Sequence, residues 1–148
     1  TAFLDEANQA DAIVFGAPTY MGDVSAGLKA FFEASAKVWF TLGWKDKLAG
    51  GFTNSFNAAG DKAQTLSSMV VFAMQHGMIW AGPGVPAASG GQNTPNLSTD
   101  QVNRFSYSVG VATQSDNAAP DVTPGSGDQE FARLYGVRLA QLAQKLKG

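Results

Sequence analysis

Cysteine is absent from the chain, and histidine occurs only once, as His76. Without cysteine there is no disulfide, no thiolate zinc site, no iron–sulfur cluster and no cysteine nucleophile. A single histidine cannot build a metal site from several imidazoles, so we expect no bound metal ion.

Charge is also scarce in this sequence. Charged residues make up 15% of the chain, against about 25% in average proteins. Ten Lys and Arg residues stand against 12 Asp and Glu residues, for a formal net charge of −2. Such a balance provides no basic surface for nucleic acid and no polybasic patch for a membrane. We therefore expect no nucleic-acid partner.

Long apolar runs are missing as well. The longest one, from Met69 to Met74, has six residues, whereas a membrane-spanning helix needs about 20. We expect no membrane insertion. No signal-like segment opens the sequence, and with no cysteine present we expect a cytoplasmic location. The 45% of hydrophobic residues can fill one core, which predicts a single domain over residues 1–148.

The order of short apolar runs and amphipathic segments predicts an α/β protein. Buried strands are expected at 12–16 and 48–55, and a third is expected to begin at Met78. Helices are expected at 2–10, 25–38 and 62–75, together with a C-terminal helix whose apolar stripe runs from Phe131 to Leu146. Strands that alternate with helices form parallel sheets.

The segment 82–127 differs in composition from the rest of the chain. It is rich in Gly, Pro, Ser, Asn, Thr and Gln. Loops of this length in a compact domain are usually functional. We expect it to form a pocket rim or a subunit contact, with a short extra strand at 107–112.

Two turns that follow predicted strands are candidates for ligand contact. In an open parallel sheet, ligands bind beyond the carboxyl ends of the strands. The residues there are 18–22 after the first strand and 54–60 after the second. Small residues in these turns expose backbone N–H groups, and Tyr20, Phe56 and Trp39 add flat aromatic faces. That combination suits a planar heterocycle with a hydrogen-bonding rim better than a free phosphate or a metal.

Several segments resemble one family of flavodoxin-like proteins. The residues that carry the resemblance are 16–22 with 25–31, 52–55 with 60–62, 74–80, 103–107 and 132–136. In combination they are similar to the tryptophan-repressor-binding-protein type of FMN-dependent NAD(P)H:quinone oxidoreductases. The similarity extends over nearly the whole chain.

The resemblance implies a fold, a cofactor and a reaction. The fold is a flavodoxin-like parallel sheet with helices on both faces and the strand order 2-1-3-4-5. The cofactor is FMN, the electron donor is NADH or NADPH, and the acceptor is a quinone. Members of this family assemble as homo-oligomers, which predicts a dimer or a tetramer.

The resemblance also assigns roles to residues. The turn after the first strand would hold one edge of the isoalloxazine ring, and the turn after the second strand would hold its pyrimidine edge and the ribityl chain. His76 would lie near the ring edge where nicotinamide or quinone docks, as the catalytic residue, and Trp39 would wall the substrate pocket. Residue by residue, the predicted FMN contacts are Pro18, Thr19, Tyr20, Met21, Gly22, Asn54, Ser55, Phe56, Asn57 and Gly60.

The sequence departs from the family pattern in one place. The family's Gly-rich phosphate loop after the first strand has no counterpart, and the segment 89–94 follows no clear strand and precedes no helix, so it is no substitute. Against the family order, the first strand–helix–strand unit is missing. We therefore expect that these 148 residues are part of a longer polypeptide.

Two other functions remain open on the sequence alone. One is a flavodoxin-type electron carrier that serves protein partners, although such carriers are usually strongly acidic. The other is a flavodoxin-like scaffold that binds no FMN and acts as an interaction module. For His76 the alternative role is structural, in the last turn of a helix where a cation is favourable.

Overall fold

The computed structural model describes residues 2–88 and 97–148. Residues 89–94, which the sequence analysis rejected as a replacement for the phosphate loop, lie outside the described residues. The elements follow in the order α1 (Ala2–Gln9), β1 (Ala12–Tyr20), β2 (Asp23–Val24), α2 (Ala26–Ala34), α3 (Ala36–Phe40), β3 (Leu48–Ser55), α4 (Lys62–Gln75), β4 (Ile79–Trp80), β5 (Val111–Gln114) and α5 (Ser126–Lys147).

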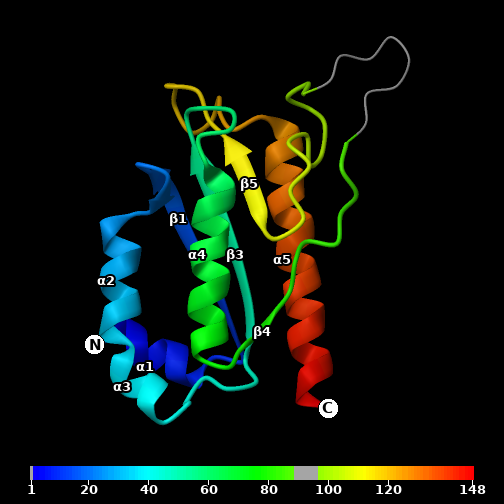
Figure 1. The fold of residues 1–148 in the computed structure, drawn as a ribbon. Helices are drawn as coiled ribbons and strands as arrows, with labels where there is room; N and C mark the ends of the chain where they lie inside the picture. The colour runs from blue at the N-terminus through cyan, green and yellow to red at the C-terminus, as the bar shows by residue number, and fades with distance from the viewer. Residues whose placement is uncertain (1, 89–96) are drawn as a thin grey trace.

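The sheet is parallel apart from one hairpin. β1 pairs with β3 over seven residues, from Ala12 with Leu48 to Pro18 with Asn54. On the other side of β3, β4 pairs with its first residues and β5 with its last four. β2 is antiparallel to the end of β1. The predicted parallel α/β sheet is confirmed, and all carboxyl ends of the parallel strands point to one end of the molecule (Figure 1).

Strand β1 is longer than predicted. It continues through Pro18 to Tyr20, where the sequence pattern indicated a loop. The reason is a two-residue hairpin turn at Met21 and Gly22, both of which have positive φ angles, of 49° and 80°. Two consecutive residues of this kind match the twist of antiparallel strands. The turn therefore keeps residues 17–20 extended.

The helix expected over 25–38 is divided in two. At Ser35, between α2 and α3, the side-chain hydroxyl donates to the carbonyl of Phe32 at 2.7 Å. A serine hydroxyl bonded to a preceding carbonyl competes with the helical pattern. The extra strand expected at 107–112 also lies elsewhere, at 111–114.

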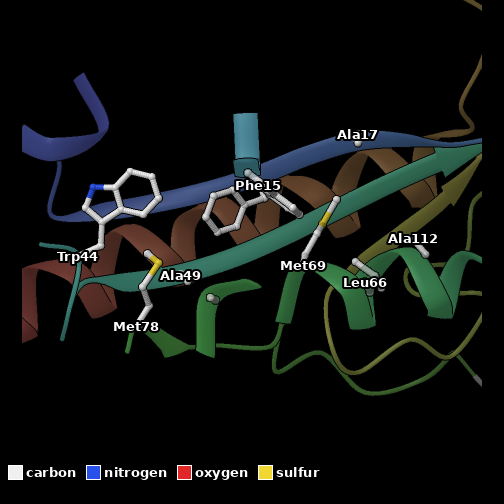
Figure 2. Close-up of a cluster of buried hydrophobic side chains, with 10 residues drawn as sticks. Phe15, Ala17, Trp44, Ala49, Leu66, Met69, Met78 and Ala112 are labelled. Carbon is white, nitrogen blue, oxygen red and sulfur yellow. The ribbon is translucent and has the colours of Figure 1, made fainter. Parts of the chain in front are cut away.

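Helices cover both faces of the sheet and enclose two apolar clusters. The larger cluster contains Phe15 from β1, Phe32 from α2 and Met69 from α4, and Figure 2 shows its side chains gathered along β1 and β3. The second cluster lies between the sheet and α5, where Phe131 and Tyr135 are buried. The three-layer arrangement that the resemblance implies is therefore present (Figure 1).

Glycine allows this close layering at the centre of β3. A Cβ atom on Gly50 would lie 2.5 Å from the hydroxyl oxygen of Tyr135 in α5. On Gly51 it would lie 2.8 Å from the sulfur of Met69 in α4. The two glycines thus let one helix approach each face of the same strand.

The helices of residues 2–88 and 97–148 include none that is long and apolar enough to cross a membrane.

Candidate functional site

A cleft of about 690 Å³ lies at the carboxyl ends of β1 and β3. One wall is the β1–β2 turn and the other is the loop between β3 and α4, and both turns stand at the same end of the molecule in Figure 1. All ten predicted FMN contacts line this cleft, together with one residue that the prediction lacked, Asp61. The lining residues are Pro18, Thr19, Tyr20, Met21, Gly22, Asn54, Ser55, Phe56, Asn57, Gly60 and Asp61.

The β1 wall presents an aromatic face over a polar base. Tyr20 is 66% exposed at the cleft, so its ring is free to contact a ligand. Thr19 points the other way. Its hydroxyl oxygen lies 2.7 Å from that of Thr53 in β3 and 2.8 Å from that of Thr65 in α4. The three hydroxyls tie the strand ends to α4, which fixes the floor of the cleft.

The loop of residues 55–60 forms the opposite wall, and the carbonyl groups of Ser55, Phe56, Asn57 and Ala59 accept hydrogen bonds. These bonds come from three residues outside the loop: Ser115 N donates to Ser55 O at 3.1 Å, Gln114 Nε2 to Phe56 O at 3.0 Å, Lys62 Nζ to Asn57 O at 2.5 Å, and Lys62 N to Ala59 O at 3.1 Å. Within residues 2–88 and 97–148, the backbone N–H groups of residues 57–60 find no acceptor. The loop is therefore a surface of free donors.

Lys62, the first residue of α4, is fully buried beneath this loop. Its ammonium group also donates to the hydroxyl of Ser55 at 2.8 Å. Burial lowers the pKa of Lys62 below its usual 10.5, the carboxylate of Asp128 raises it, and the nearby guanidinium of Arg104 lowers it.

A buried ion pair completes the support of the loop. Arg104 donates to both carboxylate oxygens of Asp128, at 3.0 and 2.9 Å, and to Oε1 of Gln114 at 3.2 Å. The backbone N–H of Gln114 donates to the same carboxylate at 3.0 Å. A bidentate pair of this kind fixes orientation well, so the amide of Gln114 that holds Phe56 O is itself held in place.

The sequence of this chain is similar to those of several known proteins. Residues 1–93 match the model of a family described as NADPH-dependent FMN reductase. The chain belongs to this family. It is 42% identical over 142 residues to flavodoxin FldP of Pseudomonas aeruginosa, covering 96% of this chain and 75% of the relative. It is 31% identical over 147 residues to an NAD(P)H dehydrogenase (quinone) of Geobacter sulfurreducens, covering 99% and 68%.

A solved structure supports the same assignment. The crystal structure of a WrbA-like flavodoxin from Agrobacterium tumefaciens superposes with a TM-score of 0.68 at 37% sequence identity. The superposition covers 96% of this chain and 71% of that one. The flavodoxin-like fold and the resemblance to this type of oxidoreductase are thus confirmed, and the chain is an FMN-dependent oxidoreductase of the FMN reductase family.

The cleft fits the isoalloxazine part of FMN. That ring system carries carbonyl oxygens and ring nitrogens along one edge, and these need hydrogen-bond donors. The N–H groups of Asn57 and Gly60, which line the cleft, are such donors, since within residues 2–88 and 97–148 no backbone carbonyl accepts from them. The rings of Tyr20 and Phe56, which are 66% and 64% exposed, offer flat faces for a planar ligand.

His76 is not part of this cleft, which corrects the expected position beside the flavin. It follows the last residue of α4, whereas the cleft loop precedes the first. A helix of 14 residues spans about 21 Å. His76 is 1% exposed, packs against the rings of Trp44 and Phe72, and places Nε2 2.9 Å from the hydroxyl of Ser35. Its surroundings are those of the structural alternative.

Trp39 also lies outside the cleft as one copy of the chain forms it. It belongs to α3, at the opposite end of the molecule from the two turns (Figure 1). Its ring is 40% exposed and contacts Phe40, with 4.9 Å between the ring centroids. Within one copy of the chain, this tryptophan cannot reach a ligand in the cleft.

Sequence reasoning missed the residues that support the loop from behind. Lys62, Arg104, Gln114 and Asp128 come from four separate parts of the chain, and only the fold brings them together. A charged residue at the start of a helix is ordinarily exposed to water. The sequence therefore held only a weak indication of this support: Lys62, Arg104 and Asp128 are charged residues in a chain with few charges.

Proposed function

We propose that this chain is an NAD(P)H:quinone oxidoreductase that holds the isoalloxazine ring of FMN between the β1–β2 turn and the loop 55–60. The observation that carries the proposal is the loop itself: four of its carbonyl groups accept hydrogen bonds, while within the described residues 2–88 and 97–148 the N–H groups of residues 57–60 have no acceptor. The relatives named NAD(P)H dehydrogenase (quinone) support the choice of donor and acceptor.

The chemistry comes from the cofactor. When bound, FMN would supply hydride chemistry: NAD(P)H would give up two electrons and one proton and become NAD(P)⁺, and a quinone would gain two electrons and two protons and become a quinol. The second proton comes from water. This reaction needs no strong acid or base from the protein, in agreement with a cleft that contains no histidine.

The residues of the chain bind and orient. The N–H groups of residues 57–60 hold the acceptor-rich edge of the ring, and Tyr20 and Phe56 exclude water from its faces. Donors fixed before the ligand arrives need no reorganisation on binding, which favours both affinity and orientation. Nicotinamide and quinone would then use the same open side of the cleft in turn.

The test combines binding with turnover. Purified protein titrated with FMN should show the perturbed visible spectrum of a bound flavin, and the loaded protein should oxidise NAD(P)H when a quinone is added, without a partner protein. Tyr20→Ala should weaken FMN binding about tenfold, a loss of roughly 1.4 kcal/mol. Phe3→Ala, at an equally exposed aromatic residue on α1, is the matched control. A protein that takes up no flavin would contradict the proposal.

An electron carrier is the second candidate, because the relative with 42% identity is named a flavodoxin. A carrier would bind FMN in the same cleft but would reduce quinone slowly without a protein partner. The net charge of −2 gives the surface little of the acidity that such carriers use. The rate of quinone reduction in the assay above separates the two functions.

We also propose that the chain assembles as a homo-oligomer, a dimer or a tetramer. Support comes from α3 and the residues after it, where Trp39, Phe40 and Leu42 are all exposed. Neighbouring exposed apolar side chains are typical of interaction surfaces. Phe40→Glu should lower the mass that light scattering measures in solution, and an unchanged mass would argue against this surface.

A further inference from the structure

A buried positive charge lies directly behind the cleft wall. Lys62 is fully buried, and both acceptors of its ammonium group, the hydroxyl of Ser55 and the carbonyl of Asn57, belong to residues that line the cleft. The ammonium group therefore contacts the cleft-lining residues Ser55 and Asn57 directly.

The surroundings of Lys62 leave this charge only partly neutralised. The ring of Phe105 lies near two cations, with its centroid 5.7 Å from Lys62 Nζ and 4.5 Å from Arg104 Cζ. The carboxylate of Asp128 is taken up by Arg104 in a bidentate ion pair. Together the three charged groups carry a net charge of +1. A further carboxylate, that of Asp61, lines the cleft itself.

A fully buried lysine is costly to a fold, because its ammonium group loses its hydration. The first turn of a helix does not need a cation, since the helix dipole disfavours positive charge there. Both hydrogen bonds of the Lys62 ammonium group go to the loop 55–60, so we relate its burial to the cleft that this loop lines.

We propose that Lys62 is a positioning residue of the flavin site, which anchors the loop 55–60 from behind and places a positive charge there that favours the reduced form of FMN. This inference rests on the proposed function and adds a residue that acts through the loop. A reduced flavin carries more electron density along its ring edge than an oxidised one, and a nearby cation stabilises that density. The free N–H donors and the cation thus act on the same side of the ligand.

The experiment compares four forms of the full chain: wild type, Lys62→Met, Gln114→Met and Lys145→Met. Lys62→Met keeps most of the length of the side chain and removes its charge and donors. Gln114→Met releases the carbonyl of Phe56 but leaves the cation in place. Lys145→Met makes the same charge change on the exposed last turn of α5. Lys62→Gln, which keeps a donor without the charge, gives the same comparison if the methionine variant does not fold.

Two measurements use these variants. The first needs no flavin: the rate at which chymotrypsin cuts after the exposed Phe56, which rises when the loop is released. We expect faster cutting in Lys62→Met and Gln114→Met than in wild type and Lys145→Met. The second measures FMN affinity and the two-electron midpoint potential of the bound flavin. Both loop variants should bind oxidised FMN about tenfold more weakly.

The midpoint potential of the bound flavin distinguishes the effect of the Lys62 charge from the effect of anchoring the loop. Lys62→Met should weaken binding of reduced FMN by a further factor of ten, which corresponds to a midpoint potential about 30 mV more negative. Gln114→Met and Lys145→Met should keep the wild-type potential. An unchanged cutting rate in Lys62→Met overturns the anchor, and an unchanged potential overturns the charge. If wild type takes up no FMN, the proposed function and the flavin part of this inference fail together, while the cutting rates still decide the anchor.

Discussion

At the scale of single residues, His76 links pH to stability. Burial lowers the pKa of its imidazole below the usual 6.5, and within the described part of the chain its Nδ1 has no hydrogen-bond partner. In the unfolded chain the imidazole binds a proton near pH 6.5, so between the two pKa values the unfolded state holds more protons. The stabilisation is complete above pH 6.5 and is lost as the pH falls through the pKa of the folded state.

His76→Phe should remove this dependence. The phenyl ring would pack between Trp44 and Phe72, as the imidazole does, and it cannot titrate. Urea unfolding at pH 7.5 and 5.5 should show a larger loss of unfolding free energy in wild type than in the variant, by at most about 1.4 kcal/mol per pH unit. Equal losses in the two proteins would mean that His76 is not buried as a neutral group.

Residues of the site differ in how well a sequence predicts them. The ten predicted contacts in two turns share one cleft because turns that follow adjacent parallel strands must meet at one end of a sheet. The role of His76 came from family resemblance and that of Trp39 from resemblance together with its flat ring, and neither residue stands at the carboxyl end of a strand. The supporting cation Lys62 depends on burial, which is a property of the folded chain.

At the scale of elements, the packing of α5 on the sheet depends on Gly50. Its missing side chain leaves room for Tyr135, whose hydroxyl accepts a bond from Gly51 N at 3.1 Å and donates to the carbonyl of Ala81. Gly50→Ala would force the helix outward and disturb both bonds. We expect a loss of about 1–3 kcal/mol of unfolding free energy, the usual cost of overpacking.

The control for this prediction is Gly27→Ala in α2. A Cβ atom there meets nothing within 4 Å, and alanine is the better helix former by up to about 1 kcal/mol. Chemical denaturation should therefore order the proteins with Gly27→Ala at or above wild type and Gly50→Ala below it. The reverse order would show that α5 does not sit closely on β3.

Elements were predicted best where apolar patterning and turn residues agreed. The strand 48–55 and the helix 62–75 have the predicted bounds, because each is an apolar segment between clear turns. Predictions were wrong where local chemistry decided the outcome, as at Ser35, whose hydroxyl ends α2, and at the Met21–Gly22 turn, which extends β1. Polar competition of this kind is not visible in hydrophobic periodicity.

At the scale of the whole molecule, binding of FMN should stabilise the fold, because the cleft joins two parts of the chain that are separated in sequence. The β1–β2 turn and the loop 55–60 come from different strands, and the three threonine hydroxyls connect both strands with α4. A ligand that contacts both turns binds the native state and not the unfolded chain. At a hundredfold excess over its dissociation constant it adds about 2.7 kcal/mol of stability.

Thermal unfolding measures this linkage directly. For a chain of this size, about 2.7 kcal/mol corresponds to a rise in Tm of roughly 5–10 °C. Tyr20→Ala should show a smaller rise in Tm at the same FMN concentration, since its dissociation constant for FMN is about tenfold higher. At a tenfold higher FMN concentration the variant should show the same rise as wild type. Because mass action alone sets this relation, a Tm that stays constant at every FMN concentration would mean that the native cleft does not bind the cofactor, whatever the chain does in an activity assay.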